Sequence, residues 1–224
     1  MELKLLVISD IHGRGWAASK LSIIASRGNY DAILVSGDLS PYLSIKTAKD
    51  MLEILIESGL PVYYVPGNMD DPKLAKGVNV DGAFCVHRKC IQFKDDLYIM
   101  GVGGGLIGPF KTPFEFTEND FNKILSEVSV KLTSNKFILL THNPPYNTVV
   151  DKLSWGEHVG SMSIRRFVEE RQPILHVCGH IHEARGVDKI GKTVIVNPGP
   201  AMRGYYGEVL IKDEEVKVNL MKLQ

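Results

Sequence analysis

The sequence predicts an α/β protein, termed α+β in some schemes, in which two mixed β-sheets pack together and helices cover their outer faces. Short β-branched runs recur along the chain and end in polar residues, and such continuous apolar runs are typical of strands buried on both faces. Segments with helical spacing separate the first three runs, as in a largely parallel sheet. Two further segments have the pattern of hairpins, which adds antiparallel strands.

Each element has its own signal in the sequence. The predicted strands cover residues 4–10, 32–38, 62–68, 137–143, 173–180 and 193–199. Helices are expected over 16–28 and 44–58, the second ending before Gly59 and Pro61, and over 117–130, opening at Thr117. A fourth helix begins at Ser161 or Ser163 and ends before Pro173, and hairpins cover 90–102 and 207–222. No linker interrupts this series, so we expect one domain over residues 1–224.

Composition limits the classes of function. The 224 residues are 44% hydrophobic and 23% charged, as in ordinary globular proteins. The 26 basic and 26 acidic residues cancel, so no overall positive field attracts nucleic acid, although a local basic patch stays possible. No stretch approaches 18 apolar residues, which predicts no membrane span. Three cysteines are sparse and odd in number, which favours a reducing, cytoplasmic location. The sequence does not indicate an oligomeric state.

Polar side chains follow successive predicted strands. Because residues beyond the carboxyl ends of strands meet in one crevice of an open α/β sheet, these side chains form a group. It offers three oxygen and four nitrogen ligands, more than one ion uses, so the count predicts two ions that share a carboxylate. Glycines at 13, 37, 67 and 179 would let the backbone turn sharply beside them. The predicted metal ligands are Asp10, His12, Asp38, Asn68, His142, His180 and His182.

These motifs resemble those of the calcineurin-like metallophosphoesterase superfamily. The family pattern is D-x-H, G-D, G-N-[H]-[DE], H and G-H-x-H. In this chain it reads Asp10-Ile11-His12, Gly37-Asp38, Gly67-Asn68-Met69-Asp70, His142 and Gly179-His180-Ile181-His182, with a later N-P-G turn at 197–199.

The resemblance implies a four-layer αββα sandwich and a two-metal active site. One ion would be held by Asp10, His12 and His182, the other by Asn68, His142 and His180, with Asp38 bridging. A hydroxide between the ions would attack phosphorus in line, so Asp38, Asn68 and His142 are also catalytic candidates. The mixed ligands suit Mn²⁺, Fe²⁺ or Fe³⁺, Zn²⁺ or Ni²⁺ and do not select one metal.

One position departs from the family pattern. Met69 replaces the histidine that many members use at the leaving group, and a thioether cannot donate a proton. Members without this histidine resemble phosphodiesterases, so a small phosphodiester is the expected substrate. Asp70 loses its usual imidazole partner and keeps at most a supporting role. His158 could supply the missing proton, or it could be a surface histidine.

Two further residues are candidates for substrate binding. Arg14 follows Gly13 and Asn143 follows His142, and both could contact phosphate beside Asn68 or be structural.

Other classes of function stay open at this point. The same fold could serve a phosphomonoesterase, a protein phosphatase, or a metal-binding scaffold with little activity. Gly103, Gly105 and Gly108 form a G-x-G-x-x-G pattern, which would suit a dinucleotide-binding oxidoreductase. That pattern must run into a helix, and Pro109 and Pro113 argue against one, so a loop beside the metal crevice is the favoured interpretation.

Overall fold

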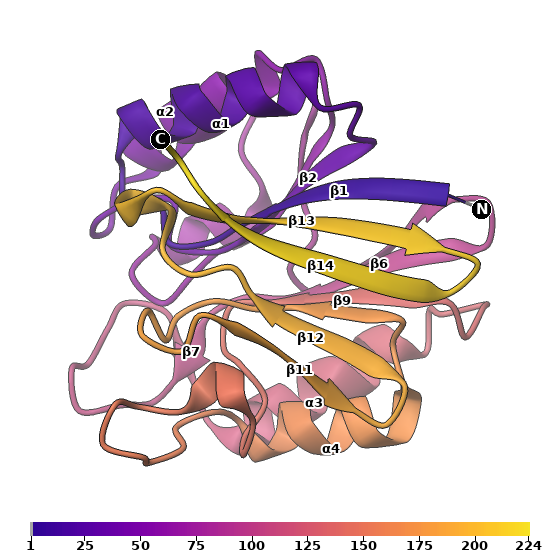
Figure 1. The fold of residues 1–224 in the computed structure, drawn as a ribbon. Helices are drawn as coiled ribbons and strands as arrows, with labels where there is room; N and C mark the ends of the chain where they lie inside the picture. Colours follow the sequence, from indigo (N-terminus) through magenta and orange to yellow (C-terminus); the bar gives the residue numbers. More distant parts are fainter. Residues whose placement is uncertain (1) are drawn as a thin grey trace.

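The computed structural model describes residues 2–224 and arranges them in four layers (Figure 1). Helices α1 (Gly15–Arg27) and α2 (Ile45–Ile56) cover one sheet, and α3 (Glu118–Ser129) and α4 (Met162–Arg171) cover the other. The two sheets pack against each other between the helical layers. The predicted fold of two mixed sheets flanked by helices is therefore confirmed.

The first sheet has the strand order β14-β13-β1-β2-β3-β4. Its parallel part consists of β1 (Glu2–Ile8), β2 (Ala32–Ser36), β3 (Val62–Val65) and β4 (Ala83–Cys85). The hairpin of β13 (Tyr205–Lys212) and β14 (Glu215–Lys222) joins it antiparallel to β1. The beginning and the end of the chain thus share one sheet.

The second sheet has the order β11-β12-β10-β9-β6-β5. Four parallel strands form its centre, namely β12 (Thr193–Asn197), β10 (Leu175–Val177), β9 (Phe137–Thr141) and β6 (Leu97–Val102). The edges are antiparallel, β5 (Lys89–Lys94) beside β6 and β11 (Gly186–Ile190) beside β12. Shorter elements lie in the connections: η1 (Pro72–Lys76), β7 (Gly105–Leu106), β8 (Glu115–Phe116), η2 (Val149–Asp151) and η3 (Ala201–Arg203).

Three apolar clusters fill the spaces between the four layers. Alternate side chains of a strand point to opposite faces of its sheet. In β1, Leu6 and Ile8 therefore pack toward α1 and α2, while Leu5 and Val7 pack between the sheets. Phe137 of β9 packs in the third cluster with α3 and α4. Because their strands are buried on both faces, the sequence shows continuous apolar runs.

The helix boundaries follow the predicted capping signals. Ser44 and Ser161 accept hydrogen bonds at the starts of α2 and α4, and Thr117 forms a capping box with Asp120 at the start of α3. The four helices agree with the prediction to within a few residues. The prediction missed β11, which pairs antiparallel with the following strand β12 across a turn at Gly191 with φ of 60°.

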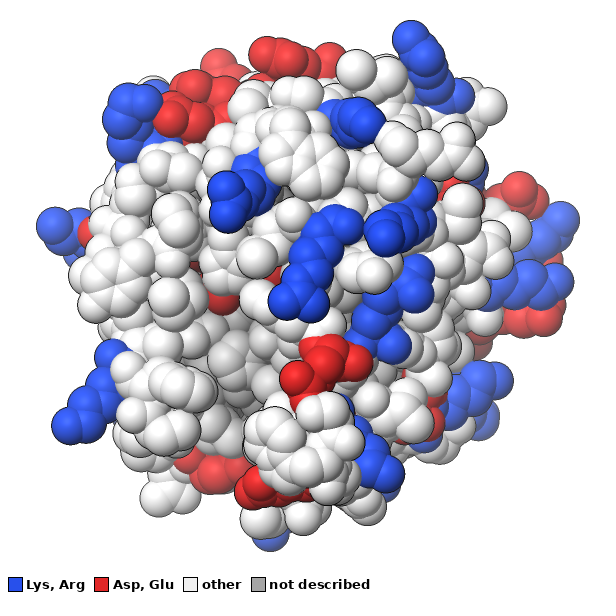
Figure 2. All heavy atoms as spheres, turned by 60° about the vertical axis from the view of Figure 1, so that its left-hand side comes forward, with Lys and Arg blue, Asp and Glu red and all other residues white. Residues whose placement is uncertain are grey.

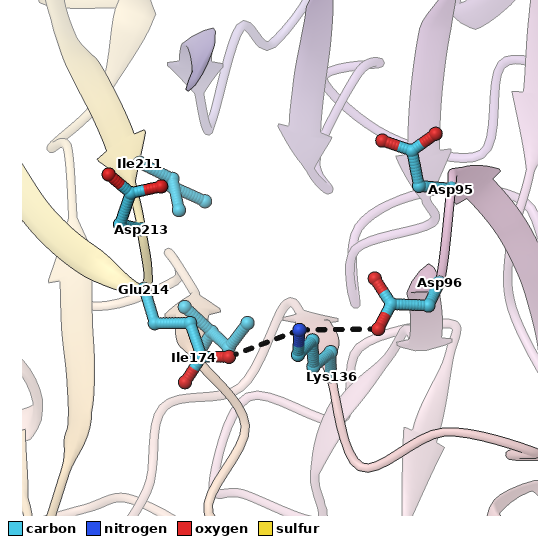
Figure 3. Close-up of a pocket in the computed structure, with 7 residues that line it drawn as sticks. All are labelled: Asp95, Asp96, Lys136, Ile174, Ile211, Asp213 and Glu214. Carbon is cyan, nitrogen blue, oxygen red and sulfur yellow. Dashed lines mark ion pairs between the residues drawn. The ribbon is translucent and has the colours of Figure 1, made fainter. Parts of the chain in front are cut away.

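A polar pocket of about 300 Å³ lies at the amino-terminal ends of β9 and β10 (Figure 3). Lys136 forms ion pairs there with Asp96, 3.2 Å away in the β5-β6 turn, and Glu214, 3.3 Å away in the β13-β14 turn. These half-exposed pairs join the turns of two hairpins, one from each sheet, and contribute little to stability individually. The predicted metal ligands lie at the opposite ends of the strands.

Candidate metal centre

The loops beyond the carboxyl ends of β1, β2, β3, β9 and β10 carry all seven predicted ligands. Main-chain hydrogen bonds tie neighbouring loops together: Asp10 N donates to Gly37 O at 3.1 Å, His12 N to Asp38 O at 2.8 Å, and Gly179 N to His142 O at 3.0 Å. The strands end two or three residues before the predicted boundaries, so the ligands lie in loops and not in the sheets. The crevice expected from the parallel topology is therefore present at this end of the molecule.

One group of side chains surrounds Asp10. His182 Nε2 lies 3.2 Å and His12 Nε2 3.9 Å from Asp10 Oδ1, and the two imidazole nitrogens are 3.4 Å apart. Asp10 Oδ1 is buried and has no hydrogen bond of acceptable geometry among the described residues. Three atoms that can donate electron pairs thus converge on one small volume.

A second group lies next to the first. His142 Nε2 is 2.8 Å from Asn68 Oδ1 and 3.5 Å from Asp38 Oδ2, and the rings of His142 and His180 are in contact at 4.9 Å. Asp38 Oδ2 also lies 3.6 Å from His12 Nε2, so this carboxylate reaches toward both groups. Asp10 does so too, since one of its oxygens lies within 4.8 Å of ligand atoms of Asp38 and His142.

The protons around His142 can be assigned from its partners. Its Nδ1 lies 2.7 Å from Ser36 O, which only accepts, so Nδ1 carries a hydrogen. Burial lowers the pKa of His142, which leaves Nε2 with a lone pair. Asn68 donates through Nδ2 to Thr112 Oγ1 at 2.9 Å, and that hydroxyl donates to Glu115, so Asn68 presents its oxygen to His142. Lone pairs of His142 Nε2 and Asn68 Oδ1 therefore face each other at 2.8 Å, and a cation bound to both atoms would remove their repulsion.

The pKa values of the two buried carboxylates also reflect a site that favours positive charge. Burial raises the pKa of Asp38 well above its ordinary value, and the nearby Asp10 and Asp70 raise it further. Burial acts in the same direction on Asp10, but the contact with His182 and the neighbouring imidazoles bring the pKa of Asp10 below its usual range. Burial lowers the pKa of His180 to about 3, so its imidazole is neutral and can be a ligand. The donor set fits divalent cations.

Four of the seven side chains stand on left-handed backbone. Asp10, His12, Asp38 and His180 have φ of 54°, 46°, 51° and 69°. Such conformations cost on the order of 1–3 kcal/mol each and cluster at functional sites. The strain supports the interpretation of these loops as a working site.

Glycines allow the loops to approach one another. A Cβ at Gly67 would lie 2.0 Å from Asp38 Oδ1, and one at Gly179 would lie 1.7 Å from Ser9 Oγ. Gly13 and Gly37 instead have positive φ, 71° and 93°. The glycines beside the ligands thus serve close approach or sharp turning.

The remaining predicted residues have different surroundings. Asp70 is fully buried and accepts four hydrogen bonds, from Gly67 N, Leu39 N, Ser40 N and Ser40 Oγ. Asn143 is also buried, and its amide is engaged by Leu106 N and Pro144 O. Arg14 is exposed just before α1. Burial lowers the pKa of His12, and the charge of the nearby Arg14 adds a small effect in the same direction.

His158 lies apart from the residues that line the pocket at the metal centre. Its Nδ1 donates to Asp151 Oδ1 at 2.8 Å, and its ring contacts Tyr146. Asp151 is buried and accepts further hydrogen bonds from its own loop, for example from Gly160 N at 2.9 Å. His158 therefore orders the loop that contains it.

The ligands open into a pocket of about 420 Å³. Figure 2 brings this side of the molecule forward and shows a hollow with Lys and Arg side chains gathered along one side of it. Besides His12, Asp38, Asn68, His180 and His182, the lining residues are Tyr42, Met69, Phe110, Lys111 and Thr112. Sequence reasoning missed Tyr42, Phe110, Lys111 and Thr112, because single residues in loops carry no spacing signal.

The glycine-rich segment lies beside the ligands, as the favoured interpretation expected. A Cβ at Gly105 would lie 3.0 Å from Asn68 Cβ, and one at Gly103 would lie 2.3 Å from Pro66 O. The segment continues into β7 and β8, and the next helix, α3, begins only at Glu118. The helix that a dinucleotide-binding turn requires is missing from this part of the described chain, so that alternative is wrong.

Comparisons with known proteins give a consistent result. The model of a family described as calcineurin-like phosphoesterase matches residues 3–184. An uncharacterized protein of Methanocaldococcus jannaschii is 34% identical over 204 residues, 88% of each chain. A probable cyclic nucleotide phosphodiesterase of Coxiella burnetii is 24% identical over 80% of this chain and 76% of that protein.

The fold also matches a solved structure. The crystal structure of TT1561 of Thermus thermophilus superposes with a TM-score of 0.78, at 22% identity and with 98% of this chain and 99% of that chain covered. At this identity the likeness concerns the fold. None of the helices in residues 2–224 has the length and apolar character that a membrane crossing requires.

Proposed function

The chain belongs to the calcineurin-like phosphoesterase family, and from this premise we propose that it hydrolyses phosphoesters with two divalent metal ions and prefers phosphodiesters. The observation that carries the proposal is the facing pair of acceptors, His142 Nε2 and Asn68 Oδ1, beside the carboxylate of Asp38. A protein gains nothing from burying acceptors against each other unless a cation lies between them.

The proposed ligands follow the two groups of side chains. Asp10, His12 and His182 would hold one ion, Asn68, His142 and His180 the other, and Asp38 would contact both. Ions bound there would withdraw charge from phosphoryl oxygens and lower the pKa of a water molecule. Mn²⁺, Fe, Zn²⁺ and Ni²⁺ all suit mixed imidazole and carboxylate ligands, and we would supply Mn²⁺ first.

The chain's own contribution is to hold these groups in place. The hydrogen bond from His142 Nδ1 to Ser36 O fixes the orientation of that ring, and Met69 N donates to Asp38 Oδ1 at 2.9 Å. Partners of this kind orient metal ligands and raise their affinity. We assign the same supporting role to Asp70 and, through the loop at Leu106, to Asn143.

The side chain of Met69 supports the preference for diesters. It lines the pocket, so an apolar group without a transferable proton lies where many family members have a histidine. This surface suits a substrate with a second organic group and a single negative charge on phosphorus. Arg14 is the proposed contact for phosphate near His12, although it does not line the pocket itself.

Two broader expectations remain proposals. We propose that residues 1–224 act as one domain, supported by the pairing of β13 with β1 at opposite ends of the sequence. We also propose a cytoplasmic location, which rests on the sparse cysteines.

The test compares bis-p-nitrophenyl phosphate with p-nitrophenyl phosphate, with Mn²⁺ and with a chelator. We expect faster cleavage of the diester, abolished by the chelator and by Asp38→Ala or His142→Ala in folded protein. Asp50→Ala removes an exposed carboxylate that pairs with Lys46 and should retain full activity. No metal-dependent cleavage of either ester would contradict the proposal, and a monoester preference would contradict the role given to Met69.

A further inference from the structure

Two exposed aromatic side chains line the pocket above the candidate metal centre. Phe110 is 87% exposed and Tyr42 is 56% exposed, although both belong to loops that contact buried residues. Neither ring packs on another aromatic ring within residues 2–224. Large apolar side chains left uncovered at a pocket are typical of ligand-binding surfaces.

Both aromatic loops are bonded directly to the loop that carries Asn68. In the loop of Tyr42, Leu43 N donates to Met69 O at 3.0 Å. In the loop of Phe110, Thr112 Oγ1 accepts from Asn68 Nδ2 at 2.9 Å, and Phe114 N donates to Asn68 O at 3.1 Å. The backbone near each ring is therefore tied to the loop of a proposed metal ligand.

The backbone next to each ring is in a costly conformation. Leu43 has φ of 46° and Lys111 has φ of 50°, and left-handed backbone is unusual for bulky residues. Lys111 is exposed, and no hydrogen bond or ion pair holds its ammonium group within residues 2–224, so its charge can reach a ligand. Strain that folding does not require is a mark of a functional loop.

We propose that Tyr42 and Phe110 form an aromatic subsite that stacks a planar nucleobase, so that the substrate is a nucleotide-type phosphodiester with Lys111 beside its phosphate. The proposal rests on the proposed function of the metal centre. Aromatic side chains bind bases of any sequence through their faces.

A sugar ring suits these walls less well than a base does. Sugars need several free hydrogen-bonding groups. The amide of Asn68 donates to Thr112, whose hydroxyl donates to Glu115, so beside the rings only the Tyr42 hydroxyl and the Lys111 ammonium are free within the described residues. The apolar Met69 also lines the pocket. A flat apolar surface flanked by one cation fits a base attached to a phosphate.

The experiment compares adenosine 5′-phosphate with ribose 5-phosphate, which lacks only the base, as inhibitors of the Mn²⁺-dependent cleavage of bis-p-nitrophenyl phosphate. Adenosine 5′-phosphate should inhibit more strongly. Phe110→Ala or Tyr42→Ala should weaken inhibition by adenosine 5′-phosphate roughly 5- to 150-fold and leave inhibition by ribose 5-phosphate unchanged. Phe110→Trp should retain inhibition by adenosine 5′-phosphate. The control Trp155→Ala removes an aromatic side chain that is 70% exposed outside the pocket, and it should change inhibition by neither phosphate.

A second measurement does not depend on activity. In chelator, the base protons of adenosine 5′-phosphate should shift upfield on adding the protein, and Phe110→Ala should remove that shift. Equal inhibition by the two phosphates, or a base shift that survives both alanine substitutions, would overturn the aromatic subsite. Absence of metal-dependent cleavage with an intact base shift would instead overturn the proposed function alone.

Discussion

Replacing Asp70 by alanine should show how strongly the fold supports the metal centre. Each oxygen of this buried carboxylate accepts two hydrogen bonds: Oδ1 from Ser40 N at 2.8 Å and Ser40 Oγ at 2.9 Å, Oδ2 from Gly67 N at 2.9 Å and Leu39 N at 3.1 Å. The carboxylate therefore connects the loop after β2 with the loop after β3.

The magnitude follows from these contacts. Asp70→Ala leaves three main-chain N–H groups without their partner, and an unpaired buried donor costs about 1–3 kcal/mol. Loss of a negative charge near Asp38 offsets part of this cost, since Asp70 raises the pKa of Asp38. We expect the free energy of unfolding to fall by about 3 kcal/mol. Asp70→Asn keeps one acceptor oxygen and should cost less.

Urea unfolding in chelator measures this change without any contribution from metal. Metal titration should then show a roughly 10- to 100-fold lower affinity, as for other groups that orient ligands. Asp71→Ala is the matched control, because within residues 2–224 the neighbouring carboxylate accepts a single hydrogen bond, from Lys73 N at 2.8 Å at the exposed start of η1. A free energy of unfolding of Asp70→Ala within about 0.5 kcal/mol of wild type, or an unchanged metal affinity, would refute the reasoning.

Three further predictions concern single residues. Asp38→Asn should abolish hydrolysis yet stabilise the metal-free protein by about 1 kcal/mol, because it removes a charge repelled by Asp10 and Asp70; a lower melting temperature in chelator would contradict this. Met69→His should raise the ratio of monoester to diester cleavage by at least ~10-fold, and an unchanged ratio would separate this position from the leaving group. Burial lowers the pKa of His176 to about 3, so below about pH 6.5 the unfolded chain takes up a proton that the native chain refuses. As the pH is lowered from about 6 to about 4, wild type should therefore lose about 1.4 kcal/mol of stability per pH unit more than His176→Gln does. Urea unfolding in chelator measures both slopes, and equal slopes would disprove the prediction.

The order of elements, and the gathering of the candidate ligands at one end of the strands, could be predicted because each has a periodic or local signal. The apolar runs of β1 and β9 are buried on both faces, and Thr117 and Ser161 cap helices as their positions indicate. The strand β11 alternates half-buried and exposed residues before one buried residue and has no apolar run, so the sequence pattern did not reveal it.

The surroundings of the site were harder to predict. The sequence places Asn143 beside His142 but does not tell which way its amide points, and the structure turns it toward Leu106 and Pro144. Phe110 and Tyr42 line the pocket on loops that are hydrogen-bonded to the distant loop of Asn68 and Met69. Such tertiary contacts leave no trace in the local pattern.

The ligands come from both sheets. Asp10, Asp38 and Asn68 follow strands of the first sheet, and His142 and His180 follow strands of the second. Neither sheet alone can therefore assemble the two groups, so a cation is captured only after the halves of the sandwich have docked. Bound metal would join the two sheets at this end, and at the far end they are joined by the half-exposed ion pairs of Lys136 and of Lys94 with Asp31. If the proposed ions bind, metal loading would be the closing step of assembly, and chelation would loosen the sandwich first at the edge that carries the pocket.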